Sequence, residues 1–264
     1  MVDEKYKMVE FKLNPATLTN GIYILSEINN EFESIYLKVR EKENRTYSST
    51  ELKKLPFASK TNPHKKEWDL RAKSFLRLKK YLNNKKANSN ILDLGCGNCW
   101  LTGQLSNTFN FNFYCVDVNY AELKQGNAAF ENEKIKFIYA DIFSSDIPDN
   151  IFDIIILNAT VQYFPEIKQL LDRLLLLLNN TGEIHFIDSP FYSEDEVENA
   201  RRRTAEYYKS LDFPEMAKKY FHHSYYNLSN FNYKILYNPQ SLKSKLFHLF
   251  LSKDSPFPWI VIKK

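Results

Sequence analysis

The stretch Ile91-Leu92-Asp93-Leu94-Gly95-Cys96-Gly97-Asn98 decides the fold. Its apolar first half predicts a short buried strand, and two of the chain's 6 glycines follow directly after that strand. Glycine lets the backbone bend sharply and lets a bound molecule approach it closely. In open α/β sheets, ligands bind beyond the carboxyl ends of the strands. The bend after Leu94 is therefore the first candidate for a binding site.

Short apolar runs alternate with helical patterns after this bend, which favours βαβ units and a mostly parallel sheet. We predict a Rossmann-like, seven-stranded α/β sheet with helices on both faces and an antiparallel C-terminal edge strand. The expected strands are residues 91–94, 111–118, 135–140, 152–157, 183–188, 232–236 and 259–263, and a further helix is expected at 240–251. Residues 1–62 are predicted to form an N-terminal helical extension or cap, and residues 63–264 the main domain.

Polar residues stand at the ends of three successive strands. Asp117 lies 22 positions after Gly95, where a carboxylate can bind both hydroxyls of a ribose. Asp141 ends the next strand, where it can accept the amino group of adenine, and Asn158 ends the one after that. Taken together with the glycine bend, these positions indicate a site for an adenosyl ligand.

A dinucleotide is a poor fit to this bend. The pattern GxGxxG requires Gly or Ala at position 100, where helix and strand pack closely, but the chain has Trp100. Asp93 also precedes the bend, and a carboxylate there would repel a pyrophosphate. It suits a cationic ligand instead, such as the ammonium group of a methionine moiety.

Four motifs at the strand ends resemble those of class I S-adenosylmethionine-dependent methyltransferases, and in particular the small-molecule type that includes enzymes of quinone biosynthesis. The motifs are residues 93–98, 116–119, 139–142 and 152–158, and the resemblance covers residues 64–264. It implies S-adenosyl-L-methionine as cofactor, bound by Arg71, Asp93, Gly95, Cys96, Gly97, Asp117, Val118, Asp141, Ile142 and Asn158. The chain departs from the family at Cys99, where a third glycine is common.

By this resemblance Arg71 would pair with the methionine carboxylate, although a surface arginine on an amphipathic helix is the alternative. Methyl transfer depends chiefly on alignment, and a base is needed only for a weakly acidic nucleophile. His222, His223 and Tyr163 are the candidates for such a base, with a structural or pocket-lining role as the alternative for each. The aromatic insertion at residues 193–231 is predicted to be a substrate lid.

The expected function is methyl transfer to a small, partly apolar or aromatic acceptor. Two alternatives stay open: an RNA methyltransferase, since residues 60–86 are locally basic, and a non-catalytic S-adenosylmethionine-binding protein. Nucleic acid is disfavoured because Asn158-Ala159-Thr160-Val161 lacks the prolines typical of base-amino methyltransferases. The net charge of +4 does not indicate a particular binding partner. No membrane-spanning segment is expected. The 3 cysteines are expected to be reduced, in a cytoplasmic protein with no metal site.

Overall fold

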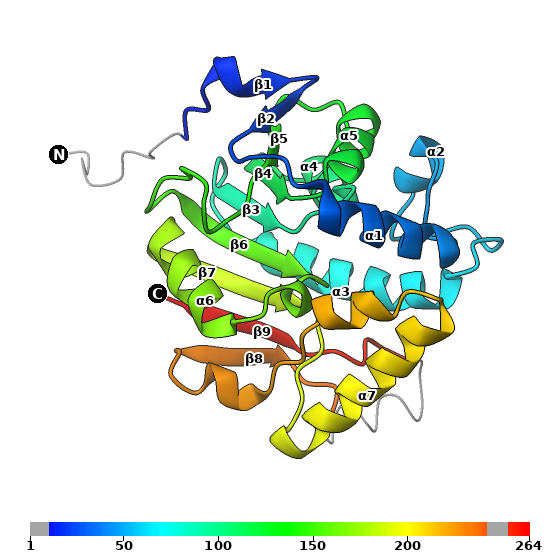
Figure 1. The fold of residues 1–264 in the computed structure, drawn as a ribbon. Coiled ribbons are helices and arrows are strands. Elements are labelled where there is room, and N and C mark those ends of the chain that lie inside the picture. Colours follow the sequence, from blue (N-terminus) through cyan, green and yellow to red (C-terminus); the bar gives the residue numbers. More distant parts are fainter. Residues whose placement is uncertain (1–10, 242–252) are drawn as a thin grey trace.

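The computed structural model describes residues 11–241 and 253–264, which build one sheet of nine strands in the order β1-β2-β5-β4-β3-β6-β7-β9-β8 (Figure 1). The strands from β2 to β7 are parallel, and β9 pairs antiparallel with both β7 and β8. The seven strands predicted from the sequence are β3 Asn90–Leu94, β4 Asn112–Asp117, β5 Ile135–Tyr139, β6 Phe152–Asn158, β7 Leu178–Ile187, β8 Tyr233–Tyr237 and β9 Trp259–Lys263. The mostly parallel sheet with its antiparallel C-terminal edge is thus confirmed.

Two further strands come from the N-terminal segment, which is therefore not helical throughout. β1 (Leu18–Thr19) and β2 (Ile22–Ile24) form a tight hairpin, and β2 pairs in parallel with β5. An edge strand exposes unpaired N–H and C=O groups, so β2 satisfies one side of β5 while it buries Ile22 completely. The hairpin is at the top of Figure 1.

Helices cover both faces of the sheet, as predicted. α3 (Lys65–Leu82), α4 (Trp100–Ser106) and α5 (Tyr120–Ala129) pack against one face, and α6 (Ile167–Leu177) covers the other. The stripe of α6 that enters the core consists of Ile167, Leu170, Leu171, Leu174 and Leu177, all buried. Each face therefore has its own apolar core, and the ends of the strands stay free for a site.

The remaining α-helices lie toward the end of the sheet to which β6 points (Figure 1). α1 (Asn30–Lys42) is joined to α5 by Glu33, whose carboxylate accepts hydrogen bonds from the backbone N–H groups of Tyr120 (3.2 Å) and Ala121 (3.0 Å). Anionic groups are favourable at a helix N-terminus. Val39 of α1 also packs on Tyr208 and Met216 of the insertion. α1 is thus held from two sides.

The other elements are α2 Ser49–Leu52, α7 Glu194–Ser210 and the 3-10 helices η1 Pro15–Thr17, η2 Val161–Tyr163, η3 Pro214–Lys219 and η4 Tyr225–Leu228. The helix predicted at residues 240–251 falls almost entirely outside the described residues. Within the described part of the chain, we find no helix with the length and apolar character needed to cross a membrane.

Candidate active site

A cavity of about 970 Å³ opens at the carboxyl ends of β3, β4, β5 and β6. The sheet order reverses between β3 and β6, so the cavity lies at the topological switch point, where α/β folds bind ligands. Its floor includes the glycine bend after β3, and α1, η2 and η3 supply its other walls. Small-molecule sites occupy about 300–1,000 Å³, so this cavity has room for a cofactor together with a second molecule.

The glycine bend has a backbone that other residues adopt only with strain. Gly95 has φ +67° and Gly97 has φ +52°, both in the left-handed region. A Cβ atom on Gly95 would lie 2.1 Å from Cγ2 of Thr160, whose hydroxyl donates to the Gly95 carbonyl at 2.9 Å. Thr160 therefore packs directly on the bend, yet Gly95, Cys96 and Gly97 all still line the cavity.

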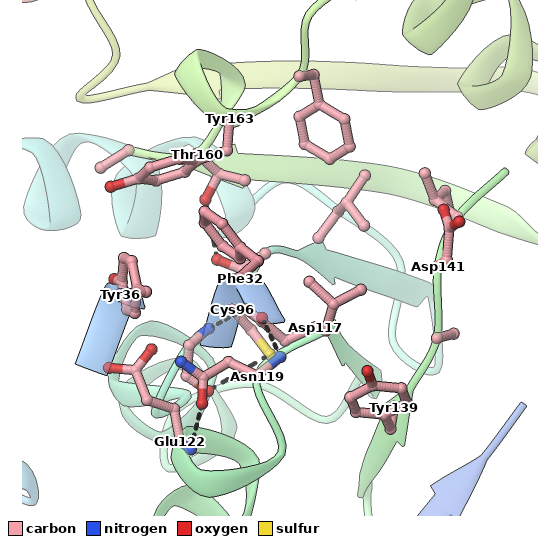
Figure 2. A pocket seen from close by; sticks show the side chains of 18 of the residues that line it. Phe32, Tyr36, Cys96, Asp117, Asn119, Glu122, Tyr139, Asp141, Thr160 and Tyr163 are labelled. Carbon is pink, nitrogen blue, oxygen red and sulfur yellow. Dashed lines mark hydrogen bonds between the residues drawn. The ribbon is translucent and has the colours of Figure 1, made fainter. Parts of the chain in front are cut away.

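Asp117 faces the same space from the end of β4 (Figure 2). Its two carboxylate oxygens accept hydrogen bonds from the backbone N–H groups of Gly97 (2.7 Å) and Asn119 (2.8 Å). Burial raises the pKa of Asp117 to about 6, although these N–H groups lower it. The remaining acceptor capacity of the carboxylate suits the hydroxyls of a ribose.

Asp141 lies at the end of β5, beyond Asp117 along the cavity wall (Figure 2). Its carboxylate accepts from the backbone N–H of Phe143 at 3.0 Å and from the hydroxyl of Ser144 at 3.2 Å. Val118, Ile142 and Asn158, the other predicted cofactor residues at the strand ends, line the same cavity. The strand-end residues are thus gathered around one space.

Asp93 differs from this expectation. It is buried with 2% of its surface exposed, it is not among the residues that line the cavity, and its carboxylate accepts from the Thr102 hydroxyl of α4 at 2.7 Å. Burial, reinforced by the neighbouring Cys115, raises the pKa of Asp93 to about 8. The strand alternation places this side chain beneath α4, turned under the bend. Contact between Asp93 and the methionine part of the cofactor stays a prediction.

Arg71 reaches the cavity from α3, as predicted, together with Arg45 from the N-terminal segment. Both guanidinium groups contact Glu67, Arg71 Nε at 3.0 Å and Arg45 Nη2 at 2.5 Å. Burial would raise the pKa of Glu67, but the hydrogen bond from Arg45 and the charges of both arginines hold it at about 2. Arg45 also pairs with Glu43 at 3.2 Å, so two carboxylates balance the two guanidinium groups beside this wall of the cavity.

Of the three predicted base candidates, one lines the cavity and two do not. Tyr163 lines the cavity, in edge contact with the rings of Phe32 and Tyr36 at centroid distances of 5.9 Å. His222 and His223 are not among the lining residues: His222 bonds to Thr204 at 2.8 Å, and His223 donates to the Val161 carbonyl at 3.2 Å. Burial lowers the pKa values of both histidines, that of His222 to about 4.

The cavity residues that sequence reasoning missed include Phe32, Tyr36 and Arg40 on α1, and Glu122 on α5. Figure 2 shows Tyr36 and Glu122 on the side of the cavity away from Asp141. Burial raises the pKa of Glu122 to about 7, although the charge of Arg40 lowers it. The helical pattern of residues 32–39 was visible in the sequence, but nothing in it indicated that α1 lies over the bend.

The cavity wall holds polar groups without protein partners. Among the described residues, buried atoms that lack a hydrogen bond include Arg40 Nε, Asn119 Nδ2 and Gln162 Oε1, and all three residues line this cavity. Buried polar groups are nearly always paired in folded proteins. Donors and an acceptor around a glycine bend and Asp117 fit the polar groups of an adenosyl cofactor with an amino-acid tail.

The fold and this site define an α/β domain with a candidate ligand cavity at the switch point of its sheet. Residues 92–186 match the family model described as a methyltransferase domain. Uncharacterised methyltransferases of Mycobacterium tuberculosis and Mycobacterium bovis are 29% identical to this chain over 94 residues, which are 36% of this chain and 47% of theirs. The chain thus matches these curated relatives over about half of their length.

Solved structures agree on the fold. The YcgJ protein from Bacillus subtilis superposes with a TM-score of 0.53 at 14% identity, covering 73% of this chain and 98% of that one. A geranyl diphosphate methyltransferase in complex with GPP and sinefungin gives a TM-score of 0.55 at 10% identity over 74% and 78% of the two chains. The match of residues 92–186 to a methyltransferase domain supports a class I methyltransferase with S-adenosylmethionine as its cofactor, and the solved structures show that the fold is shared.

Proposed function

We propose that this protein transfers a methyl group from S-adenosylmethionine to a small, partly apolar or aromatic acceptor. The observation that carries the proposal is the single cavity in which the glycine bend, Asp117 and Asp141 face an aromatic wall. The cofactor would lie along the strand ends, with adenine near Asp141, ribose at Asp117 and the methionine tail toward Gly95 and Arg71.

The wall opposite the strand ends gives the acceptor its expected character. Phe32, Tyr36, Tyr163, Phe164 and Phe221 all line it. Aromatic side chains bury large apolar areas in fixed geometry, so the wall favours a flat or apolar acceptor. Because alignment is a large catalytic contribution in methyl transfer, a rigid aromatic wall would promote the reaction by holding the acceptor in line with the sulfonium.

The insertion at residues 193–231 supports the proposed lid. It contributes Lys219 and Phe221 to the cavity wall, and the ring of Tyr220 meets that of Tyr163 edge-on at a centroid distance of 5.9 Å. Exchange of Phe221 for alanine would open this side of the acceptor space without touching the strand ends. We expect Phe221→Ala to raise the KM for the acceptor and to leave the affinity for S-adenosylhomocysteine within about twofold, as for independent sites.

An acceptor that carries a proton at its nucleophile requires a base, and Glu122 suits this role better than the histidines. A general base works best when its pKa is near the working pH. Glu122 lines the cavity with a pKa of about 7. Tyr163 has its pKa raised to about 12 by burial, so it stays protonated and acts as a hydrogen-bond donor.

The test begins with calorimetry of S-adenosylmethionine and S-adenosylhomocysteine binding to the full chain. A screen of metabolite extracts with a labelled methyl donor then identifies products that require the protein. Saturable binding of both nucleosides with a labelled small molecule supports the proposal. Binding without any labelled product would favour the non-catalytic alternative, and label appearing in RNA would favour the nucleic-acid alternative.

A further inference from the structure

All 3 cysteines of the chain meet at one point beneath the cavity. Their sulfur atoms lie within 4.8 Å of one another, and those of Cys96 and Cys99 are 3.5 Å apart. Cys96 belongs to the glycine bend, Cys99 begins α4, and Cys115 lies on β4. Sulfur ligands around one tetrahedral zinc, with Zn–S bonds of about 2.3 Å, are about 3.8 Å apart. The three thiols therefore stand near ligand spacing.

The surroundings enclose this thiol cluster on most sides. Cys99 and Cys115 are fully buried among apolar residues of the core between the sheet and α4. Gly126 of α5 packs on it so closely that a Cβ atom there would lie 3.0 Å from Cys99 Sγ. Cys96 alone of the three lines the cavity. An ion could thus enter from the cavity and then be shielded from bulk water.

A carboxyl group lies next to the cluster but outside the group of three sulfur atoms. Asp93 and Cys115 are register partners on the neighbouring parallel strands β3 and β4, so their side chains lie on the same face of the sheet. The Asp93 carboxyl group is held in place by the Thr102 hydroxyl at 2.7 Å, and its charge would complement a cation bound by the thiols.

We propose that Cys96, Cys99 and Cys115 form a binding site for a soft, thiophilic cation of the zinc or copper(I) type. Soft thiolate ligands select these ions over magnesium or calcium, which prefer oxygen. Binding is an exchange without redox change: the ion forms bonds to three sulfur atoms, and the three S–H protons pass to solvent. This site was not expected from the sequence, because Cys115 is far from the Cys96-x-x-Cys99 pair along the chain.

The experiment uses the full chain, without cofactor or acceptor, after reduction with a phosphine that is removed before the measurement in oxygen-free buffer. Zinc is titrated by competition with a chromophoric chelator, and the native reactivity of the thiols toward a disulfide reagent is followed with and without zinc. We expect one zinc per chain and protection of the thiols. Magnesium in large excess should not displace zinc, and copper(I) should.

Variants show which side chains hold the ion. Loss of an outer partner alone weakens metal binding about 10- to 100-fold, so Cys115→Ser should weaken zinc binding at least tenfold. Ser106→Ala, on the same helix α4 but away from the thiols, is the matched control and should bind as the wild type does. If Cys115→Ser does not fold, zinc binding by Cys99→Ser and the protection of the wild-type thiols by zinc are measured instead.

The proposal is overturned if zinc does not saturate at one equivalent, if zinc leaves the thiols reactive, or if folded Cys115→Ser binds zinc as tightly as the wild type. Because the measurement contains no methyl donor, this failure is distinct from a failure of the proposed methyl transfer.

Discussion

Asp117 offers the sharpest test of the cofactor position. In Asp117→Asn the side chain keeps one acceptor oxygen and gains an NH2 group, although two backbone N–H groups, of Gly97 and Asn119, now point at the carboxylate. One of these groups would face another donor. A buried group left unpaired costs about 1–3 kcal/mol, so the free energy of unfolding should fall by about that amount.

Asp117→Asn should also lower the affinity for the cofactor. A hydrogen bond to a charged group contributes about 1.5–3 kcal/mol, and each 1.4 kcal/mol is a factor of ten in affinity. We therefore expect Asp117→Asn to weaken S-adenosylhomocysteine binding about 10- to 150-fold, measured by calorimetry at a temperature where the variant is folded. Asp146→Asn is the matched control, since it makes the same chemical change at an exposed site after β5.

The reasoning is refuted if folded Asp117→Asn binds the nucleoside within twofold of the wild type. It is equally refuted if the Asp146 control loses as much affinity, because the effect would then follow from net charge and not from contact with the ribose.

Three more results are expected. Gly95→Ala should lower the free energy of unfolding, measured in urea, by about 2–5 kcal/mol: about 1–2 kcal/mol from left-handed backbone strain and about 1–3 kcal/mol from overpacking. Adding Thr160→Ser to this variant should restore only the contribution from overpacking, because it removes the methyl group nearest the new Cβ atom. Once an acceptor is identified, the single-turnover rate should rise with pH through about 7 as Glu122 loses its proton. Glu122→Gln should abolish this pH dependence and slow the reaction about 10²- to 10⁴-fold. His222→Ala should leave the pH dependence unchanged. Burial would raise the pKa of Glu183, but His185 and Lys85 hold it at about 2. The free energy of unfolding of the wild type should therefore fall as the pH is lowered from 4.5 to 2, and this contribution should be absent from Glu183→Gln.

Much of the sheet could be predicted because its strands are recognised from short, continuous stretches of sequence. Strands buried on both faces are continuous apolar runs, and this pattern located β3, β4, β5 and β6. The site residues at their ends followed from the same pattern, since the carboxyl ends of parallel strands meet along one edge of a sheet. Asp117, Asp141 and Asn158 therefore reached the cavity as expected.

The N-terminal segment could not be placed in this way. Its hairpin has only two residue pairs, and β2 is stabilised by a partner, β5, that lies more than 100 positions away. α1 is likewise fixed by Glu33 at the start of α5 and by Val39 against the insertion. Its pattern predicts a helix but carries no information on which end of the sheet it covers. For this reason the positions of Phe32, Tyr36 and Arg40 in the cavity wall could not be predicted from the sequence.

Asp93 and the cysteines share one feature that the sequence does not reveal: the alternation along a strand tells which residues share a face, but not what lies opposite that face. Asp93 precedes the bend by two positions, which suggested a ligand contact, yet the alternation of β3 turns it toward α4. Register then sets Asp93 beside Cys115, and the bend returns Cys96 and Cys99 to the same spot. The space under the bend into which Asp93 turns is therefore close to the point at which the three thiols meet.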